Sequence, residues 1–148
     1  MAQVMDSVDT LQSLLRGEIA AIETYQQALE KFENGAARGE LNEMLAQHRD
    51  TVGTLQRLVL DRGGEPETKS GVWGSWATLV TGTAKVIGTA ATLRALREGE
   101  EHGVKVYEQA IADEGVDGEA RNLARMRFLP AQHAHIARLQ RLIDEEAK

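Results

Sequence analysis

Residues 11–29 read LQSLLRGEIAAIETYQQAL, and residues 93–111 read LRALREGEEHGVKVYEQAI. Aligned so that residue 11 meets residue 93, an offset of 82, the two stretches share seven of nineteen residues. The shared residues include a Gly-Glu pair and a tyrosine seven positions after the glutamate. Both stretches are rich in Leu, Ala, Glu and Gln, with apolar residues at helical spacing. The sequence therefore predicts two related helices, one in each of two similar helical hairpins.

Turn signals divide the chain into four long helices. The first predicted helix ends at the Asn-Gly pair of 34–35 and the second at the GGEP run of 63–66, because glycine closes helices and proline cannot continue them. Gly115 separates the third helix from the fourth. We expect Asp6 or Ser7 to cap the first helix. The predicted helices span about residues 7–33, 37–62, 90–113 and 117–146.

The connections predict how these helices are arranged. Within each hairpin the loop is short, which makes the two helices antiparallel. The connection over residues 65–90 is long enough to cross the length of a bundle, and we place a short helix in it. The sequence therefore predicts an all-α fold. It is an antiparallel four-helix bundle of two similar hairpins with one long crossover, in a single domain spanning residues 1–148.

Composition narrows the classes of function. The net charge of −6 argues against a nucleic-acid partner, and the absence of cysteine removes disulfides and thiolate metal sites. Any metal must then be held by Glu, Asp and His, which suits iron, manganese or zinc. Residues 71–93 are a poor membrane span and the N-terminus lacks a signal-peptide pattern, so we expect a cytoplasmic protein without membrane association. Residues 71–90 are the expected contact surface of a homo-oligomer.

Two glutamates fall on the apolar stripes of the repeated helices. Glu18 lies midway along the stripe of the first helix, and Glu100 has the equivalent place in the second hairpin. A buried carboxylate is costly unless it faces a cation, a hydrogen-bond donor or a metal. We therefore expect both glutamates to point into the bundle, either as metal ligands or in a buried hydrogen-bond network. Tyr25 and Tyr107 are expected beside them, as core aromatic residues with a polar tip.

The second helix of each hairpin supplies histidines, but the repeat leaves their register open. The motif AQH recurs at an offset of 85 and pairs His133 with His48, whereas LQRL recurs at 84 and pairs Gln132 with His48. A one-residue slip turns a helix by about 100°, so both pairings hold only with a local bulge. Gly53 and Pro130 are the candidate positions for it. The spacing of apolar residues favours the offset of 84.

In that register, Gln132 and His135 share one face of the last helix, since residues three apart are neighbours. His102 follows Glu100 by two residues and is expected to face solvent. The candidate metal ligands are Glu18, His48, Glu100, Gln132 and His135, with His133, Gln47 and Thr51 as alternates.

This arrangement resembles the ferritin-like superfamily, and the pattern GE…Y, GGEP, GE…Y is similar to a bacterial ferritin-like group of unknown function. In that superfamily, the bundle holds two irons through one Glu from each of two helices and a Glu-x-x-His from each of the other two. The resemblance gives Glu18 and Glu100 the single-Glu positions. It gives Gln132 and His135 the place of one Glu-x-x-His, while His48 and Thr51 stand in the other, so two of four carboxylates are missing.

The resemblance implies a metal-binding protein with one or two iron, manganese or zinc ions in the bundle core, in a redox or stress-related role. The missing carboxylates leave a second hypothesis open, a metal-free bundle whose site has decayed and which acts as a structural or interaction protein. The sequence assigns no catalytic residue.

Overall fold

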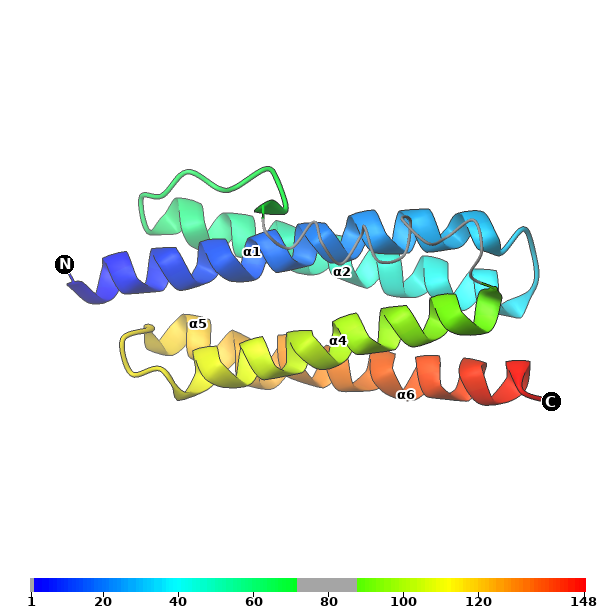
Figure 1. Cartoon of the computed structure of the whole chain (residues 1–148). Helices are drawn as coiled ribbons and strands as arrows, with labels where there is room; N and C mark the ends of the chain where they lie inside the picture. Colours follow the sequence, from blue (N-terminus) through cyan, green and yellow to red (C-terminus); the bar gives the residue numbers. More distant parts are fainter. Residues whose placement is uncertain (1, 72–87) are drawn as a thin grey trace.

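The computed structural model describes residues 2–71 and 88–148, and these form a four-helix bundle (Figure 1). Helix α1 pairs with α2, and α4 pairs with α6, as two hairpins lying side by side. The predicted all-α bundle of two hairpins is confirmed, and the described ranges contain no strand. The short helix expected in the crossover falls largely on residues 72–87, outside the described residues. The elements are α1 (Ala2–Ala28), η1 (Leu29–Lys31), α2 (Ala36–Asp61), α4 (Thr89–Ala112), α5 (Gly118–Leu123), η3 (Ala124–Phe128) and α6 (Leu129–Glu146).

Helix α1 begins earlier than its cap signals predict. The predicted N-cap at Asp6 or Ser7 is wrong, because the helix already starts at Ala2. Ser7 is buried within the helix, and its hydroxyl oxygen accepts a hydrogen bond of 2.9 Å from the backbone N–H of Asp117. The serine therefore joins α1 to the start of α5 and does not cap the start of a helix. At the other end the chain tightens into η1, so the regular helix stops at Ala28.

Two apolar clusters fill the bundle. In each long helix, buried polar side chains separate the residues of one cluster from those of the other, and together these polar side chains form a layer. One cluster surrounds Tyr25, Leu41 and Leu96, and the other surrounds Leu15 and Leu58. Each leucine that is fully buried in such a cluster stabilises the fold by about 2 kcal/mol relative to exposure. Tight packing on both sides holds the polar layer in place and keeps it away from bulk water.

The fourth helix contains one turn of π-helix, η3. In this turn the backbone N–H of Leu129 bonds the carbonyl oxygen of Ala124, five residues back. Pro130 follows as the second residue of α6, where it lacks an N–H and its ring crowds the carbonyl of the preceding turn. A widened turn just before the proline accommodates both effects. The predicted bulge exists, but it spans Ala124–Phe128 and lies at neither Gly53 nor Pro130 itself.

The π-turn settles the register between the hairpins. Beyond it, buried residues of α2 match buried residues of α6 at an offset of 84, as in His48 with Gln132 and Leu55 with Leu139. The register chosen from apolar spacing is therefore confirmed. The AQH identity does not reflect equivalent places, because His133 is exposed whereas His48 is buried.

Asp117 links the start of α5 to α1 and to the end of α2. Its substitution should therefore lower the stability of the fold. Its carboxylate accepts from the backbone N–H of Ala120 at 2.9 Å and forms two bonds with the Arg62 guanidinium, at 2.7 and 2.8 Å. We expect Asp117→Ala to lower the free energy of unfolding by about 2 kcal/mol, the sum of a lost cap and a lost charged pair. Urea denaturation measures this loss.

Glu119→Ala is the matched control, because Glu119 is exposed and makes one bond with the same arginine. It should cost less than about 0.5 kcal/mol. The hydrogen bonds from Arg62 hold the pKa of Asp117 well below its usual range. A lowered pKa stabilises the fold above the ordinary value of about 3.9 and is lost in acid, so the difference between wild type and variant should shrink below about pH 4. Equal losses for both variants would contradict this account.

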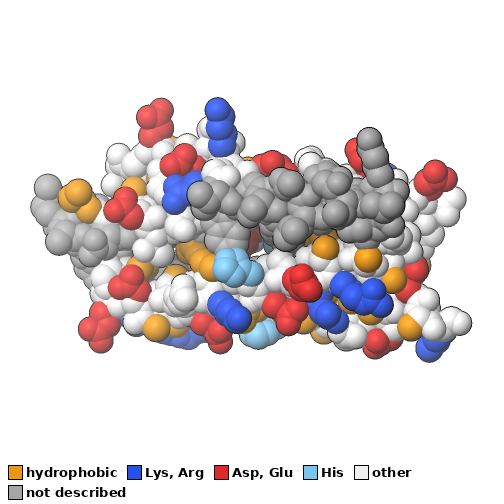
Figure 2. All heavy atoms as spheres, in the orientation of Figure 1, with side chains coloured by type: hydrophobic (Ala, Val, Ile, Leu, Met, Phe, Trp, Pro, Cys, Tyr) orange, Lys and Arg blue, Asp and Glu red, His pale blue; other side chains and the backbone are white. Residues whose placement is uncertain are grey.

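One face of the bundle carries charges of both signs. On the face drawn in Figure 2, acidic and basic side chains alternate along the helices and do not gather into a patch of one sign. None of the helices in the described ranges has the length and apolar content needed to cross a membrane.

Candidate metal centre

The polar layer at mid-bundle brings together the five residues singled out as candidate ligands. Each is at most 5% exposed, and all four long helices contribute to the layer. Their placement follows the predicted register, since each sits on the stripe of its helix that faces the bundle interior. The residues are Glu18 from α1, His48 from α2, Glu100 from α4, and Gln132 and His135 from α6.

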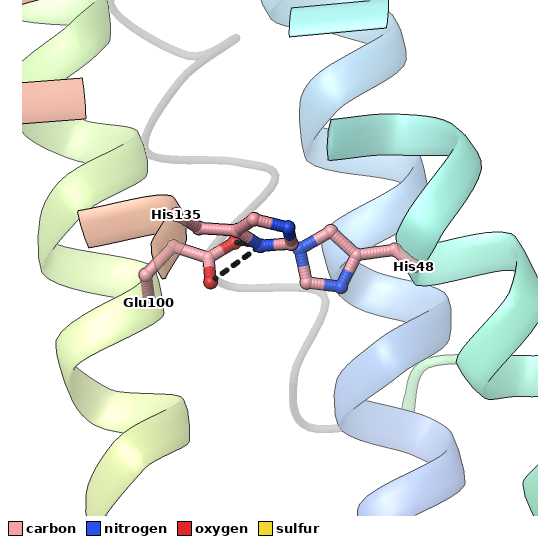
Figure 3. Close-up of side chains that lie close together, drawn as sticks. All are labelled: His48, Glu100 and His135. Atoms are coloured by element: carbon pink, nitrogen blue, oxygen red, sulfur yellow. Dashed lines mark hydrogen bonds and ion pairs between the residues drawn. The ribbon is translucent and has the colours of Figure 1, made fainter. Parts of the chain in front are cut away.

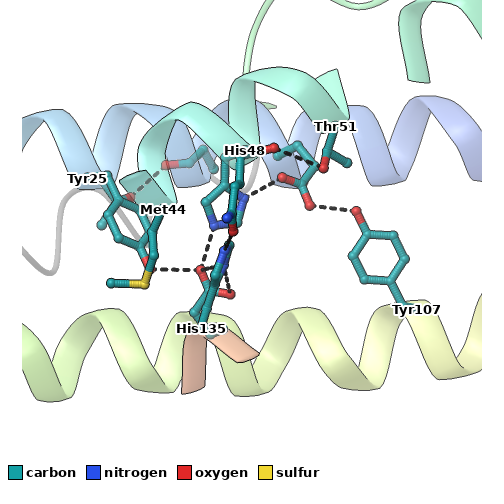
Figure 4. A network of polar contacts seen from close by, with 11 residues as sticks. Tyr25, Met44, His48, Thr51, Tyr107 and His135 are labelled. Atoms are coloured by element: carbon teal, nitrogen blue, oxygen red, sulfur yellow. Dashed lines mark hydrogen bonds and ion pairs between the residues drawn. The ribbon is translucent and has the colours of Figure 1, made fainter. Parts of the chain in front are cut away.

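His48 stands between the carboxylates of Glu18 and Glu100, and Figure 4 draws the contacts of its ring as dashed lines. Its Nδ1 lies 2.5 Å from Glu18 Oε2, and its Nε2 lies 2.6 Å from Glu100 Oε1. Burial alone lowers the pKa of His48, but the charges of Glu100 and Glu18 outweigh it and raise the pKa to about 10. Both ring nitrogens therefore carry protons that they donate to carboxylates. Burial raises the pKa of Glu100, but the charge of His48 and the hydrogen bonds from His135 and His48 outweigh it and lower the pKa of that carboxyl to about 2.

Each tyrosine of the repeat binds the glutamate of the other hairpin. The Tyr25 hydroxyl on α1 donates to Glu100 at 2.9 Å, and the Tyr107 hydroxyl on α4 donates to Glu18 at 2.5 Å. Burial, followed by the charge of the bonded glutamate, raises the pKa of both hydroxyls well above the usual range, so both stay protonated donors. The two contacts repeat the internal symmetry of the sequence and tie the hairpins together.

His135 completes a cluster of three potential ligands (Figure 3). Its Nδ1 lies 3.2 Å from Glu100 Oε2, and its ring centroid lies 4.9 Å from that of His48. On the other side of the ring, its Nε2 lies 2.5 Å from Gln47 Oε1, and this contact directs Nδ1 toward Glu100. One donor atom each from His48, Glu100 and His135 lie within 4.8 Å of one another, and all three residues are buried. This is the group of side chains best placed to hold a metal ion in the described part of the chain.

The remaining candidates take other places. His133 and His102 are exposed, so His135 is the histidine of α6 that enters the core. The Thr51 hydroxyl donates to the backbone oxygen of Gln47 at 3.1 Å, one turn earlier in its own helix. Gln47 was an alternate ligand in the sequence prediction, and here it contacts a histidine instead.

Gly103 is a site residue that the sequence did not single out. A Cβ at this position would lie 1.9 Å from Gln132 Nε2, so the amide of Gln132 occupies the space that a side chain at position 103 would need. The available signal was the repeat, in which Gly103 replaces Ala21 at the offset of 82. A lone glycine in a helix is tolerated for several reasons, so this signal alone was weak.

Comparisons with known proteins identify the family and the fold. A family model described as a domain of unknown function, DUF2383, matches residues 6–113. The chain belongs to this family. The fold is similar to the crystal structure of ferritin-like, diiron-carboxylate proteins from Bacillus anthracis str. Ames, with a TM-score of 0.75 and 18% identity over 97% of this chain and 99% of that one. The predicted ferritin-like fold is thereby confirmed. No functionally curated protein matches the sequence.

Proposed function

We propose that this ferritin-like protein binds a divalent transition-metal ion in the bundle core, through His48 Nε2, Glu100 and His135 Nδ1. The observation that carries the proposal is the group of three donor atoms within 4.8 Å of one another, on three different helices. Ligand bonds of about 2.0 to 2.2 Å bring the donor atoms of one ion to within about 4.4 Å of each other. Small side-chain movements therefore suffice to close the site.

The donor set fits iron, with manganese and zinc as alternatives. Two imidazoles and one carboxylate are ligands that these ions share in proteins. Gln47 holds the His135 ring from the side away from the site, as partners of metal-binding histidines commonly do. His48 must release its Nε2 proton before that nitrogen can act as a ligand. The diiron-carboxylate chemistry of the Bacillus anthracis proteins of similar fold supports a metal in this place.

A bound redox-active ion would supply electron exchange with a small molecule, which is the basis for a redox or stress-related role. The chain's own residues surround the site with apolar packing and two tyrosine hydroxyls, which limits access of bulk water. A homo-oligomer joined through residues 71–90 stays a prediction, since residues 72–87 lie outside the described ranges.

One observation favours the second hypothesis, a metal-free bundle that acts as a structural or interaction protein. The protonated His48 already satisfies both buried glutamates, with a bond to each at 2.5 and 2.6 Å. Side chains alone thus supply both buried carboxylates with a charged hydrogen-bond donor, which favours a bundle that folds without an ion. The two hypotheses differ in what added metal does to stability.

The test is metal content after reconstitution with iron(II), manganese or zinc and removal of unbound ion, together with the melting temperature measured with free ion present. We expect stoichiometric uptake of at least one of these ions. At a free concentration of about 100 times the Kd, binding adds about 2.7 kcal/mol, which should raise the melting temperature by roughly 5 to 10 °C.

His133 and His135 provide a matched pair for this test, since they lie two residues apart on one helix and only His135 is buried. His135→Ala should lose the metal, whereas His133→Ala should bind as wild type does. Negligible metal in the wild type, with no change in melting temperature, would support the metal-free hypothesis.

A further inference from the structure

The internal repeat assigns a second half-site to the proposed centre. The repeat relates Glu100 to Glu18 at an offset of 82. At the confirmed offset of 84, it relates His48 to Gln132 and His135 to Thr51. A two-ion centre that used both halves of the bundle would therefore take its second ion beside Glu18, with Gln132 and Thr51 where the first half has histidines.

The second half-site lacks the chemistry for an ion. Glu18 is its one carboxylate, and both oxygens already accept hydrogen bonds, from Tyr107 and His48. The Thr51 hydroxyl is committed to the backbone oxygen of Gln47. Gln132 offers a neutral amide, which is a weaker ligand for transition metals than imidazole or carboxylate. Four carboxylates offset the charge of two irons in the ferritin-like site, and the core formed by the described residues has two, so a di-iron group does not fit.

A cavity occupies this half of the centre. It has a volume of about 20 Å³ and lies between α1 and α4, with Glu18, His48, Tyr107 and Gln132 among its walls. A volume of this size holds about one water molecule. Leu14 and three glycines supply apolar parts of its wall.

Gln132 points to what the cavity holds. Its side chain is about 95% buried and lines the cavity, yet its amide makes no hydrogen bond to any residue in the ranges 2–71 and 88–148. An amide that lines a cavity and has no partner in the described residues can bond a ligand that enters the cavity. Gly103 leaves room for the Gln132 amide at the cavity, because any larger side chain at position 103 would displace the amide. The carboxylate of Glu18, which also lines the cavity, disfavours an anion and favours a hydrogen-bond donor.

We infer that the centre is asymmetric, with one metal ion at His48, Glu100 and His135, and one uncharged, water-sized hydrogen-bond donor in the cavity of Gln132 and Glu18 in place of a second ion. The count of one ion rests on the proposed function, whereas the cavity ligand does not. The inference gives each half of the repeat its own role, metal binding in one and small-ligand binding in the other.

The experiment combines elemental analysis with anomalous-scattering crystallography of the full chain grown with iron(II). We expect one iron per chain, one anomalous peak at the three ligands, and separate non-anomalous density between Gln132 and Glu18. Two irons, with the second beside Glu18, would overturn the inference. No iron would refute the proposed function alone, and the density beside Gln132 would then decide the cavity ligand, since an empty cavity refutes it.

Two variants extend the test. Thr51→His combined with Gln132→His restores the ligands of the first half-site to the second, and should raise the iron count from one to two. Gln132→Leu removes the amide and should eliminate the cavity density while the iron count stays at one. If the double variant does not fold, the iron count of the wild type still tests the single ion, and the Gln132→Leu structure still tests the cavity ligand. A loss of iron in Gln132→Leu would contradict the assignment of Gln132 to the cavity ligand.

Discussion

Replacing Glu100 with glutamine is expected to weaken metal binding by at least about 100-fold, because this residue supplies the one anionic ligand of the proposed site. Glutamine keeps the volume and a carbonyl oxygen but removes the charge that offsets a divalent ion. Glu100 is fully buried, and the described residues place no other carboxylate in the cluster with His48 and His135. Titration with iron(II) or zinc, followed by calorimetry or by metal analysis after gel filtration, measures the change.

Glu18→Gln is the control that the repeat itself provides. Glu18 occupies the equivalent position in the other hairpin, bonds the same histidine, and accepts from the equivalent tyrosine. If the metal lies in the Glu100 half of the centre, Glu18→Gln should weaken metal binding by about tenfold, clearly less than Glu100→Gln, as for a residue that bonds a ligand histidine from outside the ligand shell. Equal losses for the two substitutions would place the metal between both carboxylates and would contradict an asymmetric centre.

The architecture could be predicted from the sequence because its signals are local and repeated. The shared Gly-Glu and tyrosine positions of residues 11–29 and 93–111 indicated two hairpins before any contact was known. Apolar spacing also favoured His135 over His133, since burying the wrong stripe of a helix would expose several leucines to water, and His133 stayed an alternate until the structure showed it exposed. The inward positions of both glutamates followed from the same periodicity.

The features that the sequence did not predict depend on contacts between helices, and no local sequence pattern encodes such contacts. The tyrosines were expected near the glutamates, but their pairing across hairpins follows from how α1 and α4 lie against each other. Gln47 is an exposed residue of α2, and its contact with His135 follows from the packing of α2 against α6. The early start of α1 has the same origin, because Ser7 is held by the backbone of Asp117, about a hundred residues away.

His48→Met is expected to cost the metal-free protein about 3 to 5 kcal/mol of unfolding free energy. The substitution removes the cation between Glu18 and Glu100 and leaves two buried carboxylates facing an apolar side chain. The loss should grow from about pH 5 to about pH 8, because a buried carboxyl without a cation is tolerated only when protonated. Wild type keeps its imidazolium over this interval, since a raised pKa of about 10 means that this stabilising charge is lost only as the pH rises through that value. Denaturant unfolding of metal-free protein at several pH values measures both effects.

The same explanation predicts that the stability lost in His48→Met can be restored by neutralising the two glutamates. Adding Glu18→Gln and Glu100→Gln to His48→Met removes the unpaired charges, and the triple variant should recover most of the lost stability and its dependence on pH, because neutral groups of similar volume often replace a buried ion network at little cost. The tyrosine hydroxyls can still donate to the glutamine carbonyl oxygens, so those bonds do not confound the comparison. A triple variant no more stable than the single one at pH 8 would show that His48 acts through packing and not through its charge. Because none of these measurements requires a metal, they test the charge balance of the core independently of the proposed function.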